Sequence, residues 1–154
     1  MANRRWIVSV FAAIGLGLAG AATAQDFEGA YLGLYGATTA GDSVEAGTFA
    51  GYRFQLSEST YLGAEADILI PSGETDFLAA GLGSFAYEVL PDTLVYGRAG
   101  LAVDGADSTF WVAGAGVDHA LSDGVSLRLG GDRYDDLSGP ANDWVAKAGV
   151  ALSF

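Results

Sequence analysis

The sequence predicts an all-β fold: an eight-stranded antiparallel up-and-down transmembrane β-barrel, in which each strand pairs with the next as a meander. After residue 25 the chain divides into eight segments of about ten residues, the strand length of transmembrane barrels. Each segment has one apolar face and one face of glycine, small polar residues and a few charges. The composition agrees, because 51% hydrophobic residues, 17% charged residues and 23 glycines are an unusual combination for a soluble domain.

The predicted strands cover residues 28–37, 44–55, 60–70, 77–88, 93–103, 109–120, 125–134 and 144–154. Prolines fall only between them, as backbone hydrogen bonding in a sheet requires. Loops are predicted at residues 41–43, 71–73, 104–106 and 135–142, and tighter turns at 56–58, 90–92 and 122–124. The alternation is weakest over 77–88, where Leu82 falls on the polar face and Gly83 on the apolar face.

The charged residues of the strands share the polar faces. A charge on the lipid-facing side of a barrel costs about 2–4 kcal/mol at the membrane midplane, so these side chains are expected to point inward and pair. Four are basic and four acidic, as a closed, salt-bridged lumen requires. The predicted lumen charge network consists of Arg53, Glu65, Asp67, Arg98, Asp118, Arg128, Asp132 and Lys147.

Aromatic residues on the apolar faces gather at the strand ends. With a periplasmic N-terminus, even-numbered strands run inward from the cell surface, which predicts two aromatic girdles at the two membrane interfaces. The outer girdle contains Phe77, Trp111 and Trp144. The periplasmic girdle contains Tyr52, Phe54, Phe85, Tyr87 and Phe154.

The first residues have the pattern of a secretory signal peptide. Arg4 and Arg5 precede an uncharged apolar run, and Ala22 and Ala24 form a small-x-small cleavage site. We therefore expect a cleaved signal peptide at residues 1–24 and one barrel domain at 25–154. The alternative is an uncleaved transmembrane anchor, for which residues 6–24 are long enough.

Charge and cysteine content exclude several function classes. Residues 25–154 keep five of the seven basic residues and all 19 acidic ones, hence a net charge of −14. Such a surface repels nucleic acid and anionic lipid headgroups and tolerates divalent cations. No cysteine is present, so no disulfide or thiolate site can form. An acidic rim is expected at the extracellular end, formed by Asp42, Glu45, Glu74, Asp76, Asp104, Asp107, Asp135, Asp136 and Asp143.

Several short stretches resemble the OmpA-like eight-stranded barrels, in particular the opacity-type porin family of Gram-negative bacteria. They are residues 61–65, 114–120 and 126–129, and the terminal 152–154. The resemblance implies lumen charges at Glu65, Asp118 and Arg128, and a terminal aromatic read by the outer-membrane assembly machinery. The sequence departs from the family at Ser84 and Ala86, where a lumen lysine is expected, at Gly130, which replaces an acid, and at His119, which replaces an aromatic residue.

Candidate reactive groups have simpler explanations. Glu65 and Asp67 share a strand face and form a candidate metal or acid–base pair, but neutralisation by arginines explains them better. Residues 104–108 are similar to a calcium loop without its spacing or terminal glutamate. His119 is the only histidine, so no histidine-based triad or multi-histidine metal site can be built. No cofactor, metal or catalysis is expected.

The predicted protein is a monomeric structural or surface-interaction barrel of the bacterial outer membrane. Its expected partners are outer-membrane lipid, lipopolysaccharide, the assembly machinery and divalent cations at the acidic rim. A narrow gated channel is the main alternative, although side chains fill an eight-stranded lumen. A soluble lipocalin-like binding barrel is another. A lipid-modifying enzyme is a third, but Ser108, Thr109 and Ser138 have no histidine near them in the predicted topology.

Removal of Phe154 tests the predicted assembly signal. Deleting this residue is expected to lower the amount of folded protein in the outer membrane, which fractionation and immunoblotting measure. Normal levels of the truncated protein would contradict the signal.

Overall fold

The computed structural model describes residues 27–39, 44–71, 77–105, 108–139 and 142–154. The predicted signal peptide, with Ala22 and Ala24, lies outside these residues. Within them no helix is long and apolar enough to cross a membrane. The strands are β1 (Gly29–Thr39), β2 (Val44–Ser57), β3 (Thr60–Ile70), β4 (Leu78–Leu90), β5 (Thr93–Asp104), β6 (Thr109–Ser122), β7 (Val125–Asp136) and β8 (Asn142–Ser153).

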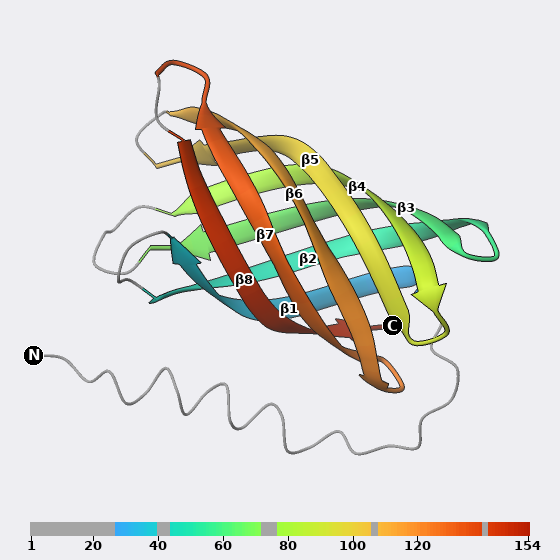
Figure 1. Cartoon of the computed structure of the whole chain (residues 1–154). Helices are drawn as coiled ribbons and strands as arrows, with labels where there is room; N and C mark the ends of the chain where they lie inside the picture. Colours follow the sequence, from blue (N-terminus) through green and yellow to red (C-terminus); the bar gives the residue numbers. More distant parts are fainter. Residues whose placement is uncertain (1–26, 40–43, 72–76, 106–107, 140–141) are drawn as a thin grey trace, which may run out of the picture.

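The eight strands form one closed antiparallel sheet. Each pairs with the next in the chain, and β1 also pairs with β8 from Tyr31 opposite Ser153 to Thr39 opposite Val145. The longer connections lie at one end of the barrel and the three tight turns at the other, beside the C-terminus (Figure 1). The predicted fold class is confirmed.

Three strands extend past their predicted ends at the turn end of the barrel because each contains a bulge beside its tight turn. The register shifts by one residue between Gln55 and Ser57 in β2, and β4 and β6 repeat this shift before their turns. The sequence predicts strand ends at residues 55, 88 and 120, whereas these strands continue to residues 57, 90 and 122, and the two-residue turns begin at residues 58, 91 and 123. In the last turn Gly124 has a positive φ of 68°, a conformation open to glycine. The extra residues Leu56, Val89 and Leu121 are exposed apolar side chains.

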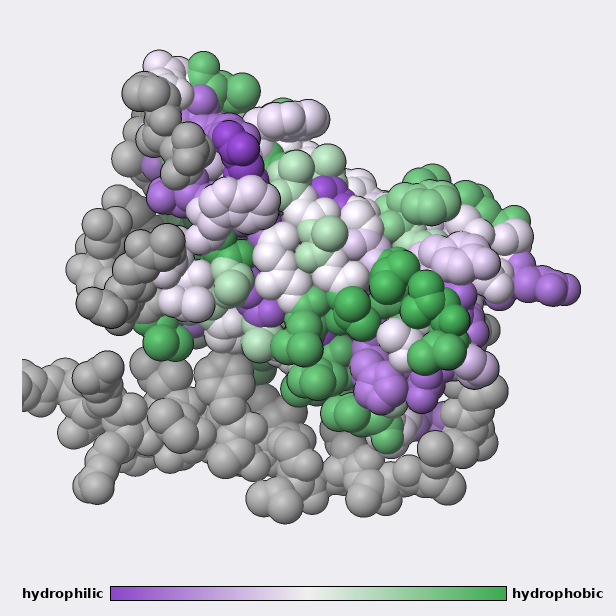
Figure 2. Space-filling model, viewed as in Figure 1, coloured by the Kyte–Doolittle hydropathy of each residue, from purple (hydrophilic) through white to green (hydrophobic). Residues whose placement is uncertain are grey.

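The two faces of the sheet differ sharply in chemistry. Large apolar side chains cover the outside, whereas eight charged strand residues are buried inside and the other charged strand residues lie near the strand ends. Figure 2 shows a wall that is mostly pale or green on the displayed face, with strongly hydrophilic residues gathered towards the ends. Leu82 is buried and Gly83 is exposed. The two residues therefore keep the regular inside–outside alternation of β4, although an apolar residue points inward and a glycine points outward.

Glycines on the inner wall make room for aromatic rings. A Cβ on Gly47 would lie 2.1 Å from the Tyr35 ring, and one on Gly116 would lie 2.4 Å from the Tyr96 hydroxyl. Eight strands enclose a space that side chains just fill, so a large residue on one strand requires a small one opposite. Tyr35 and Tyr96 therefore lie deep in the interior, only 2% and 7% exposed.

Apolar residues close both ends of the interior. At the loop end, buried Leu69, Val112 and Val145 belong to one cluster, against which Leu78 and Phe110 pack. At the turn end, a second cluster consists of Phe27, Tyr61, Ala86, Leu94 and Tyr96. The Phe27 and Tyr61 rings meet edge to face at 6.3 Å between centroids. The charged residues lie between these two groups of end residues, and Tyr31, Tyr35 and Phe49 of the first cluster lie beside them.

Substitution of Gly116 by alanine tests this packing. The new Cβ would approach the Leu129 carbonyl oxygen and the Tyr96 hydroxyl, both at 2.4 Å, and overpacking of this kind costs about 1–3 kcal/mol. We expect a lower urea midpoint for the protein refolded in micelles. The matched control is Gly81→Ala, because nothing lies within 4 Å of a Cβ at Gly81. Equal midpoints for the two variants would contradict the packing argument.

Candidate functional site

The candidate site is the charged interior, where six strands place all eight residues of the predicted lumen network. Each residue is at most 7% exposed. Only Asp118 and Arg128 are direct register partners on neighbouring strands. The other contacts join strands that are not neighbours or residues out of register, so the network links the walls of the barrel through its centre. The contributing strands are β2, β3, β5, β6, β7 and β8.

Arg128 joins two carboxylates towards the turn end. Its Nε and Nη2 donate to the two oxygens of Asp118, at 2.8 and 2.9 Å, in a bidentate pair. Its Nη1 donates to Glu65 Oε2 at 2.6 Å. Arg53 donates to the same Asp118 carboxylate from the opposite wall. This geometry uses the planar fork of the guanidinium, a geometry that a lysine cannot provide.

Arg98 and Lys147 continue the network towards the loop end. Arg98 donates to both oxygens of Asp132, at 2.9 and 2.6 Å, and also to Glu65. Lys147 Nζ lies 2.8 Å from Asp67 Oδ2 and 2.9 Å from Asp132 Oδ2. Glu65 thus accepts from two arginines and connects the two halves.

Tyrosines complete the coordination of the carboxylates. The Tyr31 hydroxyl donates to Glu65 Oε2 at 2.8 Å, and the Tyr35 hydroxyl donates to Asp67. Lys147 donates to the Tyr134 hydroxyl at 3.1 Å. β1 contributes no charge to the network but supplies two of these hydroxyls.

Aromatic faces also cover the cations. The Arg128 guanidinium lies 4.2 Å from the Phe49 ring centroid and 5.0 Å from that of Tyr96. Arg53 lies 4.4 Å from the Tyr31 centroid. Cation–π contacts of this kind gain strength when water is excluded. These rings are absent from the predicted lumen network, although Tyr31 and Tyr35 alternate with Leu32 and Leu34 and therefore share the inner face of β1.

The charged side chains of the interior neutralise one another. Each carboxylate is bound by at least one cation, and cations and acids are equal in number. In the described part of the chain, no group of three or more His, Cys, Asp or Glu side chains is arranged to hold a metal ion. Glu65 and Asp67, the candidate metal or acid–base pair, are each bound by cations and by a tyrosine hydroxyl.

The predicted girdle residues all lie on the outside of the barrel. Phe77, Trp111 and Trp144 are about half exposed at the loop end. Tyr52, Phe54, Phe85, Tyr87 and Phe154 are 43–76% exposed at the turn end. Neighbouring rings Tyr52 and Phe54 pack at 4.6 Å between centroids.

The remaining candidates have local partners. Asp104 Oδ1 accepts from the Ser108 backbone N–H at 2.8 Å; Asp107, the other acid of the stretch that is similar to a calcium loop, lies outside the described residues. His119 Nδ1 lies 3.0 Å from the Thr93 hydroxyl at the turn end. Of the predicted rim acids, Asp42, Glu74 and Asp76 are also outside the described residues.

Comparison with known proteins shows the fold class. The chain is similar to the N-terminal β-barrel domain of Pseudomonas aeruginosa OprF, with 17% identity and a TM-score of 0.64 over 82% of this chain and 98% of that domain. It is also similar to the Yersinia pestis outer membrane protein Ail, with 10% identity and a TM-score of 0.57 over 81% of this chain and 99% of Ail. A de novo designed barrel, TMB2.3, matches at 20% identity and a TM-score of 0.62 over 82% of this chain and 94% of the design.

These likenesses place the chain among transmembrane β-barrels by fold. No protein-family model matches the sequence, and no curated protein sequence matches it. A designed barrel matches this chain as well as natural barrels do, so the shared fold by itself does not indicate an activity.

Replacing Glu65 by leucine tests the interior network. Arg98 and Arg128 would each lose a carboxylate, and the interior would hold one uncompensated positive charge. Breaking a buried pair in this way costs about 3–5 kcal/mol, so the urea midpoint in micelles should fall clearly.

The matched control is Arg133→Gln, which breaks the exposed ion pair with Asp135. An exposed pair contributes about 0–1 kcal/mol, so this midpoint should hardly move. Equal effects of the two variants would show that the interior charges are not coupled as described.

Proposed function

We propose that this chain is a monomeric outer-membrane protein of a Gram-negative bacterium, with a structural or surface-interaction role. One observation carries the proposal: the chemistry of the barrel is inverted relative to a soluble protein. The interior holds eight charges, whereas the outside presents leucine, isoleucine and valine between two belts of aromatic side chains. A wall of this kind is stable in lipid and unstable in water.

The aromatic belts set the orientation in this proposal. Tryptophan and tyrosine favour the membrane–water interfaces, and the belts lie at the two ends of the wall. The tight turns and both described chain ends then face the periplasm, while the loop end with Asp135, Asp136 and Asp143 faces outward. An acidic rim in this position suits divalent cations and the cation-bridged lipopolysaccharide of the outer leaflet. Kinship with the opacity-type porin family remains a prediction from the short sequence stretches.

The packed interior favours a closed barrel over the alternative of a gated channel. An apolar cluster lies at each end of the charged layer, and the cations and carboxylates between them bind one another. An ion entering the lumen would have to displace these contacts. A lipocalin-like binding barrel is disfavoured by the same features, because its ligand cavity would have to be apolar and empty.

The arrangement of polar side chains also favours a role without catalysis. Thr109 and the neighbouring Ser108 lie at the loop end, whereas His119 lies at the turn end beside Thr93. A serine or threonine nucleophile needs a base within hydrogen-bond reach. The barrel length separates Ser108 and Thr109 from His119, and the Thr93 hydroxyl beside His119 donates its proton to Asp92 Oδ1 at 3.0 Å.

Electrophoresis of the refolded protein tests the proposal. Residues 25–154 are refolded in detergent, and unboiled and boiled samples are compared on SDS gels. Faster migration of the unboiled sample, with a β-rich circular dichroism spectrum, is the expected result. Identical migration together with solubility in plain buffer would contradict a membrane barrel. Planar-bilayer recordings of the same sample should show no steady conductance, and discrete channel openings would favour the channel instead.

A further inference from the structure

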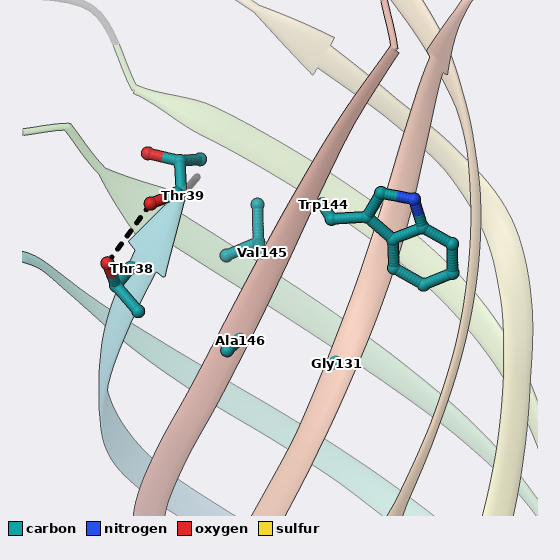
Figure 3. Close-up of a pocket in the computed structure, with 6 residues that line it drawn as sticks. All are labelled: Thr38, Thr39, Gly131, Trp144, Val145 and Ala146. Atoms are coloured by element: carbon teal, nitrogen blue, oxygen red, sulfur yellow. Dashed lines mark hydrogen bonds between the residues drawn. The ribbon is translucent and has the colours of Figure 1, made fainter. Parts of the chain in front are cut away.

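A groove crosses the outer wall near the loop end, over β7, β8 and β1. It consists of two hollows of about 290 and 350 Å³ that share Thr38 and Ala146. Figure 3 shows the first hollow, with Ala146 and Thr38 on adjacent strands and the Trp144 indole turned over β7. The Thr38 hydroxyl donates to the Thr39 carbonyl at 3.1 Å, so its polar group is satisfied within its own strand.

The floor of the groove is made of small residues and its borders of large ones. Gly36, Ala146 and Ala148 line the floor, with Gly36 directly opposite Ala148. Trp144 lines the end nearest the loops and Val44 one side. The next outward pair towards the turn end, Leu34 opposite Val150, closes the other end. From Trp144 to Ala148 the strand rises about 13 Å, at about 3.3 Å per residue.

A cation lies beside the mouth of this groove. Arg133 is the direct register partner of Trp144 on β7, and outward-facing partners on adjacent strands are about 5 Å apart at Cβ. Every other lysine or arginine in the described ranges is buried in the lumen, whereas the Arg133 side chain is 45% exposed. Its Nε and Nη2 both donate to Asp135 Oδ1, at 2.9 and 2.8 Å, which orients the guanidinium and leaves further N–H donors available.

We propose that this groove binds a phosphorylated lipid of the outer leaflet, with one acyl chain along the floor and the lipid phosphate on Arg133. The inference rests on the proposed function, which makes the loop end the outer surface. The groove then has the same orientation as a lipid molecule of the outer leaflet. Arg133 and Trp144 lie at the level of the headgroups, and the apolar floor runs from there towards the membrane midplane. A guanidinium is the side chain best suited to binding a phosphate through paired hydrogen bonds.

The surrounding charges make Arg133 decisive for recognition. Asp135 contacts it directly, and Asp143, the register partner of the buried Tyr134, lies at the same rim. Both carboxylates repel an anion, so without the arginine the mouth of the groove would be wholly acidic. The acyl chain contributes contact area for any lipid, whereas the phosphate contact with Arg133 distinguishes a phosphorylated lipid from an unphosphorylated one.

Lipid retention measured by native mass spectrometry tests the site. The full chain is expressed in a Gram-negative host, extracted, and transferred to phosphatidylcholine nanodiscs that contain a small fraction of lipid A or of dephosphorylated lipid A. The wild type should retain lipid A about tenfold better than the dephosphorylated form, the ratio expected for one charge-assisted hydrogen-bonded contact. Added inorganic phosphate should not displace it, because the acyl chain contributes to binding.

Two variants separate the two parts of the site. Arg133→Gln should abolish the preference for the phosphorylated lipid, and Ala146→Phe should fill the groove and lower the retention of both lipids. The controls are Ala66→Phe, an exposed small residue on β3 away from the groove, and Asp135→Asn, which removes a repelling carboxylate; both should retain lipid A at least as well as the wild type.

The outcomes distinguish the site from the barrel. Equal retention by the wild type, Arg133→Gln and Ala146→Phe would overturn the proposed site, and displacement by inorganic phosphate would overturn the role of the acyl chain. The unboiled gel shift is measured on the same samples. Loss of lipid preference with the shift intact concerns only the groove, whereas loss of the shift in the wild type would remove the proposed function itself.

Discussion

The need to neutralise charge inside a narrow barrel governs the rest of this structure. An interior of eight strands has little room for water, and an isolated buried charge is very unfavourable there. Glu65 meets this need by accepting from two arginines and Tyr31, which joins Asp118 on one side to Asp132 on the other. The strand register must hold these groups within hydrogen-bond distance, since a slip of one residue would turn each charge of the slipped strand to the outside.

The same confinement explains the distribution of glycine and tyrosine. Tyr35 reaches Asp67 only because Gly47 leaves space for its ring, and Tyr96 covers Arg128 above Gly116. Small residues therefore have a positive role in the interior: they set where large rings can lie, and the rings in turn cover the cations. On the outside, small residues have a different effect, since Ala146 and Ala148 leave a hollow that no side chain of the described wall fills.

The fold and the charged interior could be predicted because both depend on a period of two. Parity along each strand puts Arg53, Asp118 and Lys147 on the inner face without any knowledge of their partners. The partners themselves depend on which walls face each other across the lumen, so the link from Arg53 to Asp118 was beyond a reading of single segments. The bulges were missed because Leu56 and Leu121 look like ordinary residues before a turn. The groove could not be predicted because it forms where β1 and β2 lie beside β7 and β8, two pairs of strands that are far apart in the sequence.

The positions of the tryptophans provide an intrinsic fluorescent probe of one end of the barrel. Trp111 and Trp144 are the tryptophans of the described chain, and both lie on the outer wall at the loop end, whereas the interior uses tyrosine and phenylalanine. In residues 25–154, intrinsic tryptophan emission therefore comes from the loop end of the barrel alone. Quenchers attached at different positions along lipid chains would read how far that end has travelled through a bilayer during insertion, with no added dye and no signal from the lumen.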